Sequence, residues 1–210
     1  MQPPTSSSTY DATQGTVLVD GVDVRDYTFD ALYDRLGYVT QKAVLFSGTV
    51  QDNIFFGQSE AADTDETLQQ ALQLSQAAEF VDRYPEKAAH PIAQLGRNVS
   101  GGQKQRLSIA RALARRPEIL IFDDSFSALD YKTDATLREG LAKQLPGTTK
   151  IIVAQRISTI RHADQILVLD RGEIAGLGPH DALMASCPVY REIAMSQLSE
   201  EELKKGGASK

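Results

Sequence analysis

The chain alternates short apolar runs with longer amphipathic segments. Runs at 36–39, 119–122, 149–154 and 165–169 have the length and composition of β-strands. Segment 64–77 places Leu68, Ala71 and Leu72 at helical spacing, and a second long helix is expected at 131–144. The run at 119–122 is flanked by a proline and by acids, so we expect a strand buried on both faces of a parallel sheet. The pattern therefore predicts an α/β fold.

Shorter elements are expected at both ends of the regular region. A hairpin is predicted from strand 16–19 through a turn at Asp20 and Gly21 to a return strand at 22–24. Thr28 and Thr49 are candidate N-caps of short helices, and Thr64 is the candidate cap of the helix at 64–77. The remaining expected elements are a strand at 173–175 and helices at 157–162, 181–185 and 189–197.

The stretch 98–130 combines a glycine turn with acids at the end of a strand. Ser100 can cap a helix, and Gly101 and Gly102 leave backbone N–H groups unshielded at the positive end of that helix. Such a turn suits the approach of a phosphate. Asp123 and Asp124 follow the predicted strand, at the edge where open α/β sheets bind ligands, and a carboxylate there can hold Mg²⁺ beside a nucleotide. Each feature alone is common in α/β proteins. Their occurrence together in this order is what indicates a phosphate-binding site.

In this order, and followed by Ser127 to Asp130, these features resemble the nucleotide-binding domain of ABC transporters, closest to half-transporter exporters. Segment 99–103 is similar to the signature loop of the family, 119–123 to its Walker B strand, and 127–130 to its D-loop. The resemblance extends from about residue 10 to about residue 197. It implies an α/β fold with an incomplete RecA-like P-loop NTPase core, an ABC helical subdomain, and ATP and Mg²⁺ as cofactors.

The resemblance also implies roles for single residues. Asp123 would position Mg²⁺, and Gln41 would contact the metal and the γ-phosphate. Leu45 and Phe46, which follow Gln41, would be exposed side chains that dock on the transmembrane domain of an exporter. The residues expected to contact a nucleotide shared with a second ABC nucleotide-binding domain are Asp130 and the signature residues Ser100, Gly101, Gly102 and Gln103.

The resemblance divides the chain into five parts. Residues 1–9 are expected to be a disordered or adventitious start, and 199–210 a flexible tail. Segment 10–48 would be a partial RecA-like core up to the Q-loop, and 49–115 the helical subdomain with the signature loop. Segment 116–198 would complete the RecA-like core with Walker B, the D-loop and the switch loop.

Two residues depart from the family pattern at the nucleotide site. Asp124 stands where a glutamate normally orients or deprotonates the attacking water, and a misplacement of about 1 Å can cost ~10²-fold in rate. Gln155 stands at the switch position of a histidine, and it cannot carry that positive charge. For each change alone, neutral sequence drift is an alternative to a functional change. Jointly they resemble the degenerate subunit of heterodimeric exporters, whose signature loop completes the competent site of the partner.

The 210 residues contain no G-x-x-x-x-G-K-[ST] sequence, which is the Walker A loop that cradles nucleotide phosphates. In the family this loop precedes the region where the resemblance begins. We therefore expect an N-terminally truncated copy. We also expect the chain alone to bind ATP weakly at best and to be inactive.

Composition limits the partners. A net charge of −6 argues against a nucleic-acid-binding face, and Arg106, Arg111, Arg115 and Arg116 are expected to form a solvated helix face. No apolar run approaches the roughly 20 residues that span a bilayer. We expect attachment to the cytoplasmic face of the plasma membrane through a transmembrane partner, and a cytoplasmic location for the isolated fragment. The single cysteine, Cys187, is expected to be a structural or surface thiol.

Two alternatives from other classes remain. The first is a non-hydrolysing regulatory or decoy subunit that lends its signature loop to a partner. The second is a DNA-repair or chromosome-maintenance ABC ATPase, against which the short acidic chain without heptads argues.

Overall fold

The structure is a computed structural model that describes residues 12–57 and 64–197. It divides into two compact units, Met1–Ile151 and Ile152–Lys210, which are considered separately below. The expected disordered start at 1–9 and the expected tail at 199–210 lie outside the described residues.

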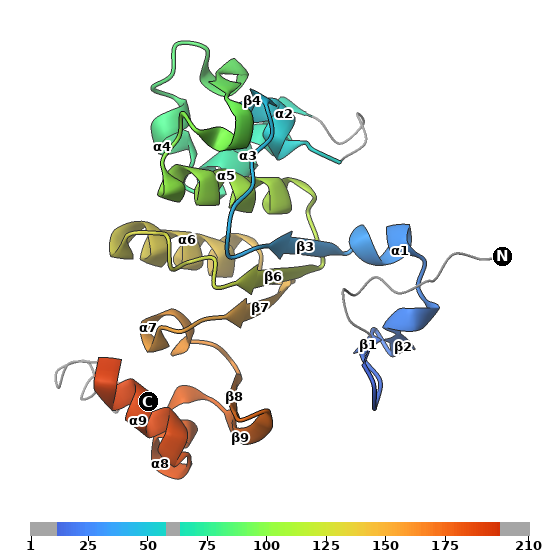
Figure 1. The fold of residues 1–210 in the computed structure, drawn as a ribbon, viewed down its shortest axis with the longest axis vertical. Coiled ribbons are helices and arrows are strands. Elements are labelled where there is room, and N and C mark those ends of the chain that lie inside the picture. Colours follow the sequence, from blue (N-terminus) through green and yellow to red (C-terminus); the bar gives the residue numbers. More distant parts are fainter. Residues whose placement is uncertain (1–11, 58–63, 198–210) are drawn as a thin grey trace. The chain divides into compact units, whose positions relative to one another are not determined.

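A three-stranded sheet organises the first unit, and the end of its last strand belongs to the second unit (Figure 1). Its strands lie in the order β3 (Leu36–Val39), β6 (Ile119–Asp123) and β7 (Thr149–Val153). β3 and β6 are parallel, with Tyr38 opposite Ile121. The parallel pairing confirms the prediction, and it brings the carboxyl ends of these two strands to the same edge.

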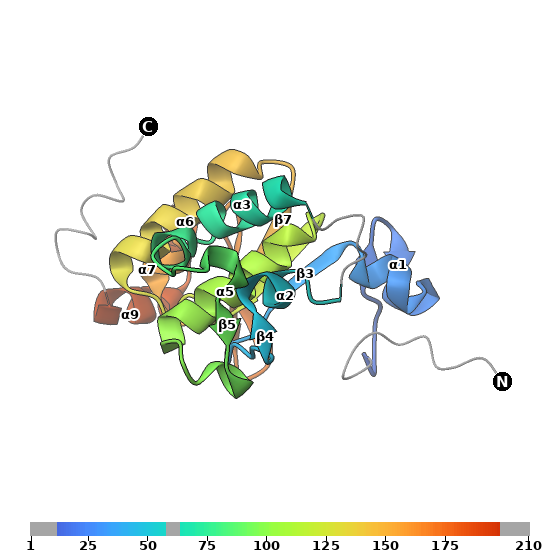
Figure 2. The same ribbon diagram turned by 90° about the horizontal axis from the view of Figure 1, so that it is seen from above.

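One face of β6 is more deeply buried than the other. Leu120 and Phe122 are fully buried, whereas Ile119 and Ile121 are only partly covered by the described residues. The long helix α5 (Gly101–Ala114) packs against neighbouring β3 (Figure 2). Side chains alternate between the two faces of a strand, so Ile119 and Ile121 share the face that is only partly covered. The expectation of a strand buried on both faces is therefore wrong for the described chain.

Helices α2 (Val50–Ile54) and α3 (Asp65–Leu74) pack against α5, and α4 (Ala78–Val81) packs against α3. The hydroxyls of Thr49 and Thr64 accept hydrogen bonds from backbone N–H groups three residues later, which confirms both predicted caps. α3 ends before residue 77 because the backbone turns into the left-handed region at Gln76. α6 (Tyr131–Gln144) has the predicted bounds.

Short elements complete this unit. The predicted hairpin forms, and Thr28 caps the helix α1 through the N–H of Ala31. The short strands and helices, apart from single-turn 3₁₀ segments, are β1 (Leu18–Val19), β2 (Val22–Asp23), α1 (Phe29–Tyr33), β4 (Gly48–Thr49) and β5 (Pro91–Ile92).

The second unit packs a two-stranded sheet against helices. β8 (Ile166–Asp170) pairs antiparallel with β9 (Glu173–Gly178), and the helices are α7 (Ile157–Ile160), α8 (His180–Ser186) and α9 (Pro188–Gln197). Val168, Leu183 and Tyr190 lie in the core of this unit. Cys187 is buried in the same core, so it is a structural thiol, in agreement with the sequence prediction.

Arg106 and Arg111 do not form a solvated face, so that expectation is wrong for these two residues, whereas Arg116 is exposed as expected. Arg111 Nε donates to the carbonyl oxygen of Asn53 at 2.7 Å, and its Nη1 donates to that of Val44 at 3.0 Å. Arg106 Nη1 donates to the carbonyl oxygen of Gln76, at 2.9 Å, and pairs with Glu79, also at 2.9 Å. These arginines fix the helices and loops around α5, because a guanidinium can satisfy several acceptors at once.

The expected docking residues differ in exposure. Leu45 is 1% exposed, so its assignment as an exposed contact residue is wrong. Phe46 is exposed and stacks on Phe56 with ring centroids 4.2 Å apart. The sequence does not separate the two, because the burial of Leu45 depends on a distant segment: a Cβ atom built on Gly96 would lie 3.2 Å from Leu45 Cδ1.

Candidate functional site

Three predicted site residues meet at the carboxyl ends of β3 and β6. Gln41 follows β3 by two positions, Asp123 is the last residue of β6, and Asp124 follows it. Gln41 Nε2 donates a hydrogen bond to Asp124 Oδ2 at 2.9 Å. The parallel register of the strands explains this meeting, because both chains leave the sheet at the same edge.

Tyr38 joins this group, and the sequence analysis did not identify it as a site residue. Its hydroxyl donates to Asp123 Oδ2 at 3.1 Å. The pKa of Tyr38 is raised, first by desolvation and then by the hydrogen bond to Asp123 and by the charge of that carboxylate. Residue alternation places Tyr38 on one face of β3, but only the register with β6 brings it to Asp123.

Buried polar side chains hold the two strand ends in place. Gln105 Nε2 donates to the carbonyl oxygen of Thr40 at 3.1 Å, and Ser125 Oγ donates to that of Val39 at 2.8 Å. Gln105 lies on α5, so the helix that begins at the signature residues also fixes the backbone next to Gln41. Asp124 has a φ of 45°, in the left-handed region that aspartate tolerates better than most residues.

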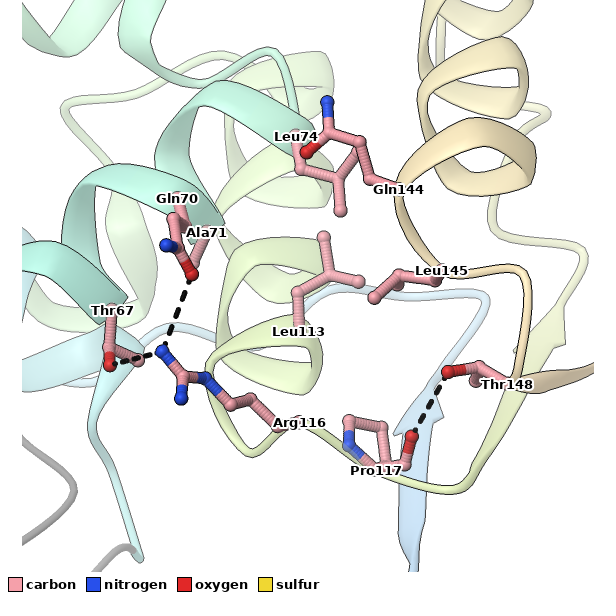
Figure 3. A pocket seen from close by; sticks show the side chains of 10 residues that line it. All are labelled: Thr67, Gln70, Ala71, Leu74, Leu113, Arg116, Pro117, Gln144, Leu145 and Thr148. Carbon is pink, nitrogen blue, oxygen red and sulfur yellow. Dashed lines mark hydrogen bonds between the residues drawn. The ribbon is translucent and has the colours of Figure 1, made fainter.

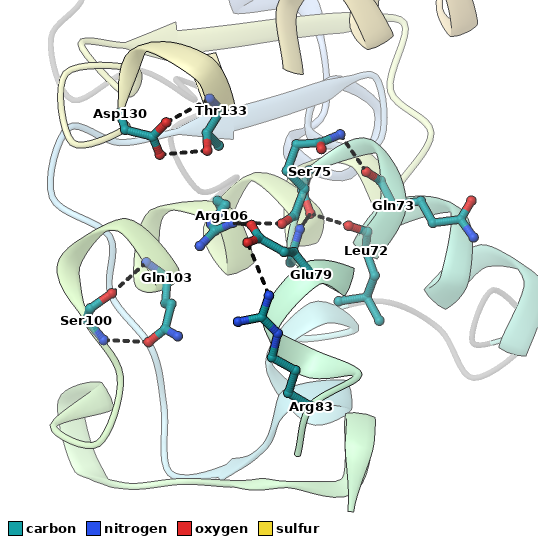
Figure 4. A network of polar contacts seen from close by, with 12 residues as sticks. Leu72, Gln73, Ser75, Glu79, Arg83, Ser100, Gln103, Arg106, Asp130 and Thr133 are labelled. Carbon is teal, nitrogen blue, oxygen red and sulfur yellow. Dashed lines mark hydrogen bonds and ion pairs between the residues drawn. The ribbon is translucent and has the colours of Figure 1, made fainter. Parts of the chain in front are cut away.

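The signature residues form the first turn of α5. Ser100 caps the helix, with its Oγ accepting from the backbone N–H of Gln103 at 3.3 Å, and Gln103 Oε1 accepts from the N–H of Ser100 at 2.8 Å (Figure 4). This reciprocal capping box confirms the predicted cap. A Cβ atom built on Gly101 would meet nothing within 4 Å. The start of α5 is therefore a capped turn with an open approach to its backbone at Gly101.

The D-loop segment lies next to this turn. A Cβ on Gly102 would lie 3.4 Å from the carbonyl oxygen of Ala128. Asp130 caps α6: its carboxylate accepts from the backbone N–H of Thr133 at 3.0 Å and from the Thr133 hydroxyl at 2.6 Å (Figure 4). The pKa of Asp130 is lowered, chiefly by the hydrogen bond from the Thr133 side chain. In this structure Asp130 thus serves as a helix cap.

Gln155 belongs to the second unit, where α9 holds its backbone. Gln197 Nε2 donates to the carbonyl oxygen of Gln155 at 2.8 Å, and Gln197 Oε1 accepts from the N–H of Ile157 at 2.9 Å. This pair of bonds anchors the segment between β7 and α7 to the end of α9. The side chain of Gln155 is exposed.

The oxygen atoms at the strand ends suit Mg²⁺, which needs few protein ligands, better than a metal ion whose ligands all come from protein side chains. Over residues 12–57 and 64–197, the structure has no cluster of three or more His, Cys, Asp or Glu side chains that could hold a metal ion. Mg²⁺ typically binds one or two carboxylates, keeps several waters and takes its other ligands from substrate phosphates. Asp123, Asp124 and the amide oxygen of Gln41 fit such a partial site.

In the part of the chain that the structure describes, no helix combines the length and the apolar character that a bilayer crossing requires.

Comparisons with known proteins agree on one family. The sequence profile described as "ABC transporter" matches residues 5–127. An uncharacterized ABC transporter ATP-binding protein of Mycobacterium tuberculosis is 47% identical over 189 residues, which cover 90% of this chain and 32% of that protein. An ATP-dependent lipid A-core flippase of Syntrophus aciditrophicus is 38% identical over 194 residues, which cover 92% of this chain and 32% of the flippase.

A solved structure of a bacterial Atm1-family ABC exporter with ATP bound matches with a TM-score of 0.85 and 36% identity. The match covers 91% of this chain and 33% of the exporter. The chain thus spans about a third of the length of these relatives. The agreement confirms the predicted α/β, RecA-like fold class. Since the profile covers more than half of the 210 residues, and includes the signature turn and the strand ending in Asp123, the chain belongs to the ABC transporter family.

Proposed function

We propose that this chain is the ATP-binding domain of an ABC exporter, in which ATP binding and hydrolysis by two such domains drive a transmembrane partner. The observation that carries the proposal is the meeting of Gln41, Asp123 and Asp124 at one sheet edge, together with the open Gly101 turn. The first group is suited to a metal and the second to a phosphate. The chain would lie at the cytoplasmic face of the plasma membrane, attached through the transmembrane partner.

The strand-end residues would hold the metal side of the nucleotide. Bound Mg²⁺ would neutralise charge on the phosphates of ATP. Asp123 would present its carboxylate to the metal, and Tyr38 would fix that carboxylate through its hydrogen bond. Gln41 already donates its amide N–H to Asp124, so its amide oxygen is the atom suited to a cation.

The signature residues would serve a second domain. Backbone N–H groups at Gly101 and Gly102, the Ser100 hydroxyl and the Gln103 amide would bind the γ-phosphate of ATP held by the partner. The capping box supports this role because it fixes the turn before any ligand arrives. Asp130, at the start of α6, would border the same dimer interface.

The nucleotide site formed by this chain's own strand-end residues is proposed to hydrolyse ATP slowly. Asp124 carries its carboxylate on a shorter side chain than the usual glutamate, and Gln155 replaces a chargeable histidine. The 210 residues also lack the G-x-x-x-x-G-K-[ST] loop. We therefore propose that the chain alone does not hydrolyse ATP and that it acts by completing the site of a consensus partner within a heterodimer.

A complementation experiment tests this role. The partner is an ABC exporter ATP-binding domain with a Walker A loop and a glutamate after its Walker B strand. Its own first signature glycine is replaced by aspartate. Such a domain cannot complete a site by itself. We expect ATP hydrolysis to appear when the present chain is added, because its intact signature turn supplies the missing half. No hydrolysis at any ratio of the two domains would overturn the proposal.

Two variants of the chain make the test specific. Gly101→Asp places a negative charge where the phosphate would approach, and it should abolish the complementation. Gly147→Asp is the control, because a Cβ at Gly147 also meets nothing within 4 Å but lies in the turn after α6. It should keep full complementation. An aspartate in the first turn of a helix is favourable, so Gly101→Asp should remain folded.

A further inference from the structure

A cavity lies in the first unit, away from the site described above. It has a volume of about 240 Å³ and lies between α3, the end of α5 and the end of α6 (Figure 3). Pro117, which lines it, precedes β6, whereas Asp123 is at the opposite end of that strand. The cavity is therefore separate from the proposed nucleotide site.

One part of the wall of this cavity is apolar, and the rest carries polar side chains such as Gln144 and Thr148. Leu74 of α3, Leu113 of α5 and Leu145 after α6 contribute side chains from three different elements (Figure 3). Its volume is below the roughly 300–1,000 Å³ of sites for drug-sized ligands. The space thus fits a short hydrocarbon chain rather than a large ring system.

The guanidinium of Arg116, an exposed residue, lines the same cavity. Arg116 follows α5 with a φ of 49°, and its Nη2 donates to Thr67 Oγ1 at 3.3 Å and to Gln70 Oε1 at 3.4 Å. Both distances are at the long end for hydrogen bonds, and both acceptors are neutral. Gln70 separates the guanidinium from Glu66, to which Gln70 Nε2 donates at 3.0 Å.

Arg116 differs in this respect from Arg106 and Arg115. Arg106 pairs with Glu79, and Arg115 pairs with Asp34. Among the described residues, 12–57 and 64–197, no carboxylate lies within ion-pair distance of Arg116. A guanidinium with weak neutral partners beside apolar side chains can gain a charge-assisted, bidentate hydrogen bond from an incoming anion.

We propose that this cavity binds a small amphiphilic carboxylate. Arg116 would take the carboxylate, and the hydrocarbon tail would lie against Leu74, Leu113 and Leu145. The bound molecule would contact α3 and the end of α6 at once, so it would stabilise the packing of these helices by mass action. The proposal does not rest on the proposed exporter function, and either can fail without the other.

Octanoate is a suitable probe for the 210-residue chain with labelled leucine methyl groups. We expect saturable NMR shifts at Leu74, Leu113 and Leu145, with a Kd on the order of 1 mM or below. Leu183 lies in the core of the second unit and should not shift. Octyl phosphate binding as tightly as octanoate would assign the site to anions in general. Octyltrimethylammonium should not bind, and equal binding of this cation would overturn the proposal, as would the absence of leucine shifts.

Variants separate the head group from the tail. Arg116→Gln should weaken octanoate at least tenfold, whereas Arg115→Gln removes a neighbouring charge that does not line the cavity and should leave the Kd unchanged. Ala71→Leu should block binding by filling the space, because Ala71 is a buried lining residue. Equal affinity of the two arginine variants contradicts the role of Arg116, and undiminished binding by Ala71→Leu contradicts the location.

Discussion

Gln41 and Asp124 are 83 positions apart in the sequence, and their side chains are joined by a hydrogen bond of 2.9 Å. The bond links the segment after β3 to the residue after β6. It exists because two parallel strands in register leave the sheet together. Asp124, at the proposed catalytic position, and Gln41, at the proposed metal-binding position, therefore contact each other in this chain.

The first prediction tests this contact by placing two carboxylates at the hydrogen-bond distance. In Gln41→Glu, like charges disfavour ionisation of both carboxyl groups. The pair should therefore still hold one proton at pH values above the ordinary carboxyl pKa of about 4. The folded-state pKa is then raised, which means that the variant loses stability as the pH rises through that pKa. Carboxyl NMR titration measures the shift. Gln73→Glu adds the same charge on the exposed side of α3 and should titrate normally.

The second prediction concerns Asn53, which is 2% exposed and fixes the loop after Gln41. Its Nδ2 donates to the carbonyl oxygens of Phe46 and Thr49, at 2.9 and 3.0 Å, and its Oδ1 accepts from the N–H of Phe46 at 2.8 Å. Asn53→Ala leaves these backbone groups unsatisfied, and we expect the free energy of unfolding to fall by about 2–4 kcal/mol. Urea denaturation measures it.

The matched control for Asn53→Ala is Thr136→Ala, at an exposed position of α6. It should change the free energy of unfolding by no more than about 0.5 kcal/mol. Equal losses in the two variants would contradict the role of the buried amide.

Local features of the fold could be predicted because they depend on residues close in the sequence. The caps at Ser100, Thr49 and Thr64 each join a side chain to a backbone N–H three positions later. The bounds of α6 follow from a cap at Asp130 and a stop at Pro146, which lie within the same segment. Such features need no knowledge of the rest of the fold.

Contacts between distant segments account for the errors and omissions. Arg111 binds Asn53 and Val44, 58 and 67 positions away, so its charge alone suggested a solvated face. The burial of Leu45 and the bond from Tyr38 to Asp123 likewise depend on packing and register that no local pattern encodes. At the candidate site, strand ends and glycines were predictable, whereas the partner of each side chain was not.

The third prediction concerns the pH dependence of Asp23. Hydrogen bonds from Arg25, first from its side chain and then from its backbone N–H, lower the pKa of Asp23 from 3.8 to about 2. A lowered folded-state pKa adds stability above the unfolded value of 3.8, and that stability is lost as the pH falls toward 2. In Arg25→Gln the pKa should rise toward 3.8, while the remaining backbone donor keeps it somewhat lower.

Carboxyl NMR titration of Asp23 in wild type and Arg25→Gln checks this shift. Arg83→Gln is the control, because Arg83 pairs with Glu79 and should leave the titration of Asp23 unchanged. A pKa that stays near 2 in Arg25→Gln would show that the guanidinium is not the cause.

The last prediction concerns Gly37, where the paired strands β3 and β6 leave no room for a side chain. A Cβ at Gly37 would lie 2.8 Å from both Leu120 Cδ2 and Pro117 Cγ, and 3.2 Å from the carbonyl oxygen of Ala112. Gly37→Ala should therefore lower the free energy of unfolding by about 1–3 kcal/mol, because the crowded core must shift.

Gly147→Ala is the matched control for Gly37→Ala, since a Cβ there meets nothing within 4 Å. Removing the flexibility of glycine from the unfolded chain should leave that variant unchanged or more stable by up to about 1 kcal/mol. Urea denaturation of both variants gives the comparison. If Gly37→Ala is as stable as Gly147→Ala, then β3 does not lie as close to Leu120 and Pro117 as described, and the placement of Gln41 beside Asp124 loses its structural basis.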